Sequence, residues 1–187
     1  QYKEAFIVVT GVLDGEVVTT CPYIWVDRDF ALVRGWVQGF PKKLGSVWMT
    51  RTFGLGTTAD PAIAAGSTFG GTLAANDRRL IDATVTLQRE STGAPAHNDP
   101  PLLNRRHFPR LAAGHHDDPA VHELVRAKSY DRAASAVWEG DATLAFGAAP
   151  NEEHTALAPV RVGTGRRFTF AYSVNDLETV ADLRDGA

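Results

Sequence analysis

Short stretches of alternating apolar and polar residues recur along the whole chain, with turn signals between them. The clearest stretch runs from Leu80 to Glu90 and is typical of a half-buried strand. Asp14-Gly15 and Asn76-Asp77 separate such stretches and are typical of hairpin turns. Many short strands with few helices favour an antiparallel sheet that curves strongly or closes on itself. We therefore predict an α+β fold that is mostly antiparallel β, with a curved sheet closing into a β-barrel-like shape.

One helix is expected over residues 30–38, with Asp27 or Asp29 as its N-cap. A further helical turn is expected at residues 151–157, and the polar segment 176–187 should fray or form a short helix. The strands are expected at residues 2–10, 16–27, 47–53, 68–75, 80–90, 102–111, 121–127, 135–139, 143–146, 160–162 and 168–174.

Length and charge narrow the classes of protein that the chain can represent. Its 187 residues suffice for one domain with a proper core, and no linker interrupts them. A formal net charge of −3 gives no reason to expect nucleic acid or an anionic membrane as a partner. The single Cys21 excludes an internal disulfide and fits a reducing cytoplasm. We interpret this cysteine as a packing residue rather than a nucleophile.

The residue types most suggestive of chemistry lie in the run Gly39-Phe40-Pro41-Lys42-Lys43-Leu44-Gly45. Its proline breaks the preceding helix, and its glycines permit tight turns or close backbone approach. Two lysines lie between apolar neighbours here. A lysine held in an apolar pocket is desolvated, which lowers its pKa and leaves a neutral, nucleophilic amine. The alternative is a loop with two solvated lysines.

Together with Pro22-Tyr23-Ile24-Trp25-Val26-Asp27, Ala31-Leu32 and Gly35, this run resembles the acetoacetate decarboxylase superfamily. The resemblance covers most of the chain and is specific in residues 2–45. It implies a barrel-like fold around Lys42, which would form a Schiff base with a keto acid without any cofactor. Lys43 would support it. The resemblance also implies a homo-oligomer, and a family N-terminal segment that this chain lacks.

The stretch Gly35-Trp36-Val37-Gln38 departs from the Gly-Arg-Glu that decarboxylases of the superfamily carry before their lysine pair. A glutamate there would repel a substrate carboxylate and assist its loss, whereas the Gln38 amide can hydrogen-bond the carboxylate and keep it. A similar glutamine occurs in the branch of the superfamily that condenses pyruvate with aldehydes. Gln38 as a solvated helix residue is the alternative.

Three further residues are candidates for the same site. Glu4 matches the glutamate of the family's Tyr-x-Glu-Ala run, and Tyr2 shares its strand face. We expect Glu4 to act as general acid or base, with Tyr2 and Phe40 lining the substrate site. Tyr172 either transfers a proton or packs in the core, because a buried hydroxyl needs a partner. Glu4 as an exposed edge carboxylate stays open.

Two polar clusters are interpreted as surface. His115-His116-Asp117-Asp118 lies in a loop, and consecutive residues rarely converge on one ion, so we expect no metal site. Arg105-Arg106-His107 could bind a substrate carboxylate, but a solvated surface is favoured.

These observations predict an aldolase-dehydratase that condenses pyruvate with an aldehyde through a lysine imine and then loses water, or runs in reverse. The second hypothesis is decarboxylation of acetoacetate or another β-keto acid by the same lysine. The third is a barrel that binds a small ligand without catalysis.

Overall fold

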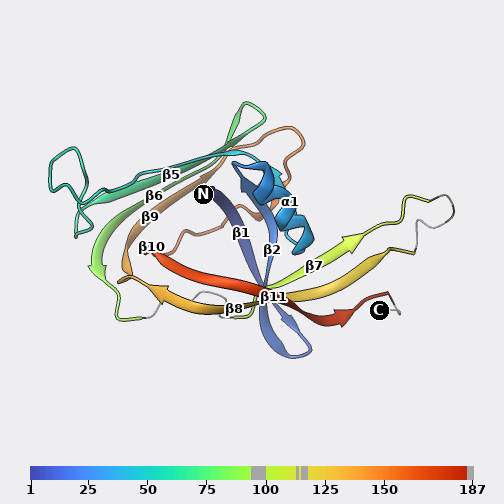
Figure 1. The fold of residues 1–187 in the computed structure, drawn as a ribbon. Coiled ribbons are helices and arrows are strands. Elements are labelled where there is room, and N and C mark those ends of the chain that lie inside the picture. Colours follow the sequence, from blue (N-terminus) through green and yellow to red (C-terminus); the bar gives the residue numbers. More distant parts are fainter. Residues whose placement is uncertain (94–99, 113, 115–117, 185–187) are drawn as a thin grey trace. The chain divides into compact units, whose positions relative to one another are not determined.

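The computed structural model describes residues 1–93, 100–112, 114 and 118–184 (Figure 1). Contacts divide the chain into two compact units, each built from separate segments. Unit 1 comprises Gln1, Gly45–Pro95 and Ala133–Ala171, and unit 2 comprises Tyr2–Leu44, Ala96–Arg132 and Tyr172–Ala187. That they form one domain stays a prediction.

Unit 2 contains a three-stranded sheet in the order β1-β2-β3. The hairpin of β1 (Glu4–Leu13) and β2 (Glu16–Val26) turns at Asp14-Gly15, as predicted, with φ of 51° and 84°. Such positive φ values are typical of the tight turns that match strand twist. Helix α1 (Asp29–Val37) then leads to β3 (Lys42–Leu44), which pairs with β2 in parallel.

Helix α1 confirms the predicted helix and its end near Gln38, but the predicted N-cap and the part assigned to Pro41 were wrong. Its N-cap is Arg28, with no side-chain cap hydrogen bond, because the Asp27 carboxylate accepts the backbone N–H of Lys3 at 2.8 Å. The helix ends before Pro41 is reached. Gly39 has φ of 83°, and the Phe40 N–H bonds to the Gly35 carbonyl at 2.9 Å. This is the Schellman arrangement, in which a left-handed glycine closes a helix.

A second sheet has the order β11-β8-β7, formed by β7 (Leu103–Phe108), β8 (Val121–Ala134) and β11 (Phe170–Asp182). The prediction that residues 176–187 fray or form a helix was wrong as far as Asp182. Cross-strand partners hold this polar segment in the sheet. Glu178 pairs with Arg126 at 2.8 Å, and the Leu183 N–H bonds to the His122 carbonyl at 2.7 Å.

Unit 1 is organised around one five-stranded sheet of order β10-β9-β6-β5-β4, which curves strongly (Figure 1). Two register shifts mark bulges in β6, one against β5 and one against β9, and bulges bend strands. The predicted turn at Asn76-Asp77 is confirmed, with positive φ at both residues. The strands are β4 (Ser46–Met49), β5 (Thr68–Ala75), β6 (Arg78–Glu90), β9 (Trp138–Phe146) and β10 (Gly165–Arg167).

Three predictions in unit 1 need correction. The strands expected at residues 135–139 and 143–146 are the single strand β9, because Gly140 lies opposite the β6 bulge instead of ending a strand. Residues 160–162 are not a strand, and β10 follows them. The strand expected at 47–53 ends at Met49. The helical turn expected at 151–157, by contrast, is confirmed as a 3-10 helix over His154–Leu157.

The described residues therefore form a mostly antiparallel α+β fold with a curved sheet and few short helices, as predicted. Trp25 and Val26 of β2 are fully buried in the core of unit 2. Leu80 and Leu87 of β6 are buried in the core of unit 1. No helix among the described residues has the length and apolar character of a membrane span.

Gly140→Ala should lower the free energy of unfolding by about 1–3 kcal/mol, the usual cost of overpacking. The added methyl would clash with the Thr86 carbonyl and lie 2.9 Å from the Gln88 backbone nitrogen. Gly163→Ala is the matched control in the same unit, since nothing lies within 4 Å of its new methyl. Urea unfolding followed by circular dichroism measures both, and equal midpoints would contradict the bulge contact.

Candidate functional site

Lys42 lies at the start of β3, where backbone contacts fix it on both sides. It pairs in register with Ile24 of β2. The Trp36 indole N–H donates to the Lys42 carbonyl at 2.8 Å, and the Lys42 N–H donates to the Phe40 carbonyl at 2.8 Å. Only 7% of Lys42 is exposed, an unusual degree of burial for a lysine. Its side chain is therefore positioned and largely shielded from water.

The stem of Lys42 runs across helix α1 at Gly35. A Cβ atom on Gly35 would clash with Lys42 Cδ and lie 2.6 Å from both Cγ and Cε. Gly35 is itself buried within the helix. The absence of a side chain at this position makes the room in which the lysine stem lies.

The Lys42 amine faces the carboxylate of Glu4, at 3.3 Å between Nζ and Oε2. Strand register explains the approach. Glu4 pairs with Val26 and Lys42 pairs with Ile24, two residues further back along β2, so both side chains leave the same face of the sheet. The Glu4 side chain is 32% exposed, against 6% for Lys42. The structure thus brings together the two residues that the sequence assigned to nucleophile and proton transfer.

Two aromatic rings flank the same amine. Lys42 Nζ lies 5.1 Å from the centre of the Tyr2 ring and 5.6 Å from that of Phe40, within the range of cation–π contacts. The Tyr2 ring packs edge-on against Phe30 of helix α1 at 5.8 Å. The amine therefore has one carboxylate and two rings around it.

Tyr172 belongs to the same cluster. Burial raises the pKa of its phenol, and the charge of Glu4 raises that pKa further. Burial likewise raises the pKa of Tyr2, with smaller contributions from Glu4 and Tyr172. Both phenols therefore keep their protons at neutral pH and can donate them as hydrogen bonds.

Sequence reasoning missed Arg34, whose positive charge lowers the pKa of both phenols and therefore acts on them through space. No described carboxylate forms an ion pair with this exposed guanidinium. The signal was present in the sequence: Phe30, Arg34 and Gln38 recur every four residues, and this spacing puts them on one helix face.

Gln38 and Lys43 are placed differently from the cluster. Gln38 caps the C-terminus of α1, its N–H bonded to the Arg34 carbonyl at 3.2 Å, and within the described residues no hydrogen bond joins its amide to Lys42. Lys43 pairs in register with Trp25. Alternation along β3 directs its side chain to the face opposite that of Lys42.

Cys21 also lies within electrostatic reach of the lysine and the glutamate. Burial raises the pKa of its thiol to about 12, Glu4 adds to that shift, and Lys42 opposes it. The residue is 3% exposed. A neutral, buried thiol is a poor nucleophile.

The polar clusters outside this site make local contacts. Arg106 pairs with Glu123 at 2.6 Å and donates to the Val37 carbonyl, where it supports the C-terminus of α1. Arg105 donates to the His122 ring at 2.8 Å. Residues 115–117 lie outside the described part of the chain. Among the residues that the structure describes, no group of three His, Cys, Asp or Glu could hold a metal ion.

A cavity of about 820 Å³ is lined only by residues of unit 1. None of the residues around the Lys42 amine lines it. The lysine cluster and this cavity therefore share no residue.

The family model for acetoacetate decarboxylase matches residues 1–183. The chain belongs to the acetoacetate decarboxylase family. This membership agrees with the resemblance found in residues 2–45. No curated protein matches the chain.

Solved structures include close likenesses to this family member. The enduracididine biosynthesis enzyme MppR, complexed with the condensation product of pyruvate and imidazole 4-carboxaldehyde, is 31% identical with a TM-score of 0.86. MppR complexed with pyruvate is 30% identical with a TM-score of 0.85. An acetoacetate decarboxylase-like enzyme from Sphingomonas wittichii RW1 is 24% identical, and its TM-score of 0.87 supports the fold.

The chain does not span these neighbours completely. Each match covers 97% of this chain but only 66% or 67% of the two MppR chains and 70% of the Sphingomonas chain. These likenesses confirm the predicted acetoacetate decarboxylase-like fold.

The Cys21 thiol should resist 5,5′-dithiobis(2-nitrobenzoic acid) at pH 8 while the protein is folded. A pKa of about 12 leaves a thiolate fraction about 1000-fold below that of an unperturbed thiol. Because Cys21 is the only cysteine, absorbance at 412 nm reports on it alone. The same protein in urea is the control and should react at once; rapid reaction of the folded protein would show that the thiol is accessible.

Proposed function

We propose that this chain carries the imine-forming lysine of an aldolase-dehydratase, which joins pyruvate to an aldehyde and then removes water. The observation that carries the proposal is the buried Lys42 amine, 3.3 Å from the single carboxylate of Glu4. The likeness to MppR, whose structures hold pyruvate and a pyruvate–aldehyde condensation product, supports the choice of substrates.

Imine formation requires a neutral amine, and Glu4 is placed to accept the ammonium proton from Lys42. The free amine would attack the ketone carbon of pyruvate, and the resulting carbinolamine would lose water. The product is a protonated imine. It withdraws electrons from the neighbouring methyl group, so that a carbon–hydrogen bond there becomes acidic.

Glu4 could next remove a methyl proton, which gives an enamine that attacks the aldehyde carbon. The new hydroxyl group on the former aldehyde carbon must then leave as water, together with a second proton from the former methyl carbon of pyruvate. Tyr2 and Tyr172 keep their phenolic protons at neutral pH and could protonate that leaving group. Hydrolysis of the imine would release an unsaturated keto acid and regenerate the Lys42 amine.

A residue must bind the substrate carboxylate, and helix α1 with its C-cap provides two candidates. Gln38 is the residue that the sequence suggested. Arg34 acts electrostatically on Tyr2 and Tyr172 and has no ion-pair partner among the described carboxylates. A guanidinium can bind a carboxylate through two parallel hydrogen bonds, so we assign the stronger contact to Arg34.

Decarboxylation of a β-keto acid is the second candidate, favoured by family membership. The same lysine imine would serve as electron sink. Loss of carbon dioxide removes the carboxylate charge in the transition state, however, and a paired guanidinium or amide stabilises the ground state and raises that barrier. Helix α1 presents Arg34 and Gln38 without a carboxylate between them, which favours condensation. Binding without catalysis is the third candidate, and the expected homo-oligomer also stays a prediction.

Pyruvate plus sodium borohydride should add one reduced adduct to the protein, on Lys42. Its amine is positioned beside Glu4, whereas Lys43 leaves the other face of β3. Peptide mass mapping locates the adduct. Lys42→Ala should abolish it and Lys43→Ala should keep it; an adduct on Lys43 instead, or no adduct at all, would exclude Lys42 as the imine-forming residue.

Two substitutions should separate proton transfer from carboxylate binding. Glu4→Gln should lower kcat by about 100-fold, the usual scale of general acid–base catalysis, while borohydride still traps the imine. Arg34→Gln should instead raise KM for pyruvate by about 10-fold, since a hydrogen bond to a charged group is lost. Glu16→Gln, at the exposed start of β2, is the control. Equal effects on kcat and KM in both variants would contradict this division of roles.

The two reactions differ in their products. With pyruvate and imidazole 4-carboxaldehyde, the protein should produce growing ultraviolet absorbance from a conjugated keto acid, with the matching mass. Acetoacetate should release little carbon dioxide. Brisk release of carbon dioxide without any condensation product would make the decarboxylase the better assignment.

A further inference from the structure

The cavity of unit 1 carries a pronounced positive charge. Arg51, Arg161, Arg166 and Arg167 line it, and no Asp or Glu is among its described lining residues. Its volume of about 820 Å³ falls within the range of small-molecule sites. A cavity of this size and charge would attract an anion.

The four guanidinium groups differ in how far their charge is already balanced. Arg166 lies 3.9 Å from Glu139, but that carboxylate is held more closely by Arg89, at 2.7 Å. Within the described part of the chain, no carboxylate forms an ion pair with Arg51, Arg161 or Arg167. Three full positive charges therefore remain for a ligand.

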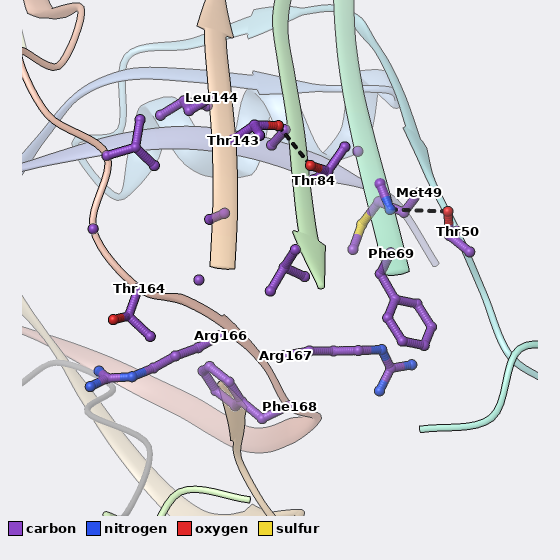
Figure 2. Close-up of a pocket in the computed structure, with 18 of the residues that line it drawn as sticks. Met49, Thr50, Phe69, Thr84, Thr143, Leu144, Thr164, Arg166, Arg167 and Phe168 are labelled. Carbon is purple, nitrogen blue, oxygen red and sulfur yellow. Dashed lines mark hydrogen bonds between the residues drawn. The ribbon is translucent and has the colours of Figure 1, made fainter. Parts of the chain in front are cut away.

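Arg167 also stacks on an aromatic ring, and this contact favours a carboxylate as the anion. Its guanidinium lies 4.4 Å from the centre of the Phe69 ring, and Phe69 is almost fully buried. Figure 2 shows the ring of Phe168 between the side chains of Arg166 and Arg167. A guanidinium stacked on a ring keeps the N–H groups at its edge free, and those groups suit a carboxylate.

One wall of the cavity, the strand wall, is formed by β5, β6 and β9, and its hydroxyl groups are already hydrogen-bonded. The hydroxyl groups of Thr84 and Thr143 are hydrogen-bonded to each other at 2.6 Å, and the Thr50 hydroxyl accepts the Gly70 N–H at 3.1 Å (Figure 2). Glycine and alanine residues of β5, β6 and β9 supply much of the remaining surface. This wall accepts an apolar body and requires no further hydrogen bonds.

We propose that this cavity is a binding site for an aromatic carboxylate, with the carboxylate group at Arg161 and Arg167 and the ring system against the strand wall. None of its lining residues belongs to the Lys42 cluster. It rests on unpaired positive charge, on the Arg167–Phe69 stack and on an apolar wall whose hydroxyl groups are already bonded.

Isothermal titration with 2-naphthoate tests the proposal on the full chain, with neutral 2-naphthylmethanol as the matched ligand. We expect one-to-one binding of 2-naphthoate with a dissociation constant of about 1 mM or tighter, the range for a ligand of this size. The alcohol should bind about 10-fold more weakly or worse, because it loses the charge-assisted hydrogen bonds. Equal affinities, or no saturable binding of 2-naphthoate, would overturn the proposal.

Substitutions locate the bound carboxylate. Arg161→Ala and Arg167→Gln should each weaken 2-naphthoate binding by about 10-fold. Arg79→Ala, at an exposed arginine paired with Asp82 in the same unit, should leave it unchanged. Lys42→Ala should leave it unchanged too, which separates this site from the imine site. Unchanged binding in both cavity variants would overturn the assignment.

Sedimentation velocity of the same proteins tests whether a second copy of the chain occupies the cavity instead. Concentration-dependent dimerisation that Arg167→Gln abolishes, without any binding of 2-naphthoate, would assign the cavity to a second copy of the chain and overturn the ligand proposal.

Discussion

The partly buried contact between the Lys42 side chain and the Glu4 carboxylate is the constraint on which the candidate site depends. A lysine that is only 7% exposed costs several kcal/mol to bury as an unpaired charge, so a partner is needed in the folded chain. The sheet β1-β2-β3 supplies it, because β2 lies between the strand of Glu4 and that of Lys42. The Trp36 hydrogen bond and the space at Gly35 complete the positioning.

Those parts of the fold with a local physical cause could be predicted from the sequence. Asp14-Gly15 and Asn76-Asp77 adopt positive φ, which few residue types tolerate, and both turns were recognised. Features that depend on a distant partner were not. Gly140 suggested a break in β9, yet the strand continues through it, because only glycine fits opposite the bulge of β6. The polar residues from Asp176 onward suggested a frayed end, but pairing with β8 holds them in a strand.

The candidate site likewise contains residues that the sequence predicts and residues that it does not. Lys42, Glu4, Tyr2 and Phe40 come from two short motifs, and the structure places them around one amine. Arg34 lies outside both motifs, and only its four-residue spacing from Phe30 and Gln38 along α1 links it to the site. Cys21 lies on β2, and no sequence pattern links it to Glu4 and Lys42. The arginine-lined cavity could not be foreseen at all, since its walls come from segments far apart in sequence.

Unit 2 is assembled from three separate segments, and this arrangement has a consequence for biosynthesis. Glu4 and Lys42 lie within one short segment and could meet while the rest of the chain is still on the ribosome. Tyr172 follows Glu4 by about 170 positions and joins them only after a long loop closes, which is the slow kind of contact in folding. During synthesis, the amine and its carboxylate would therefore exist as a pair well before the Tyr172 phenol arrives beside them.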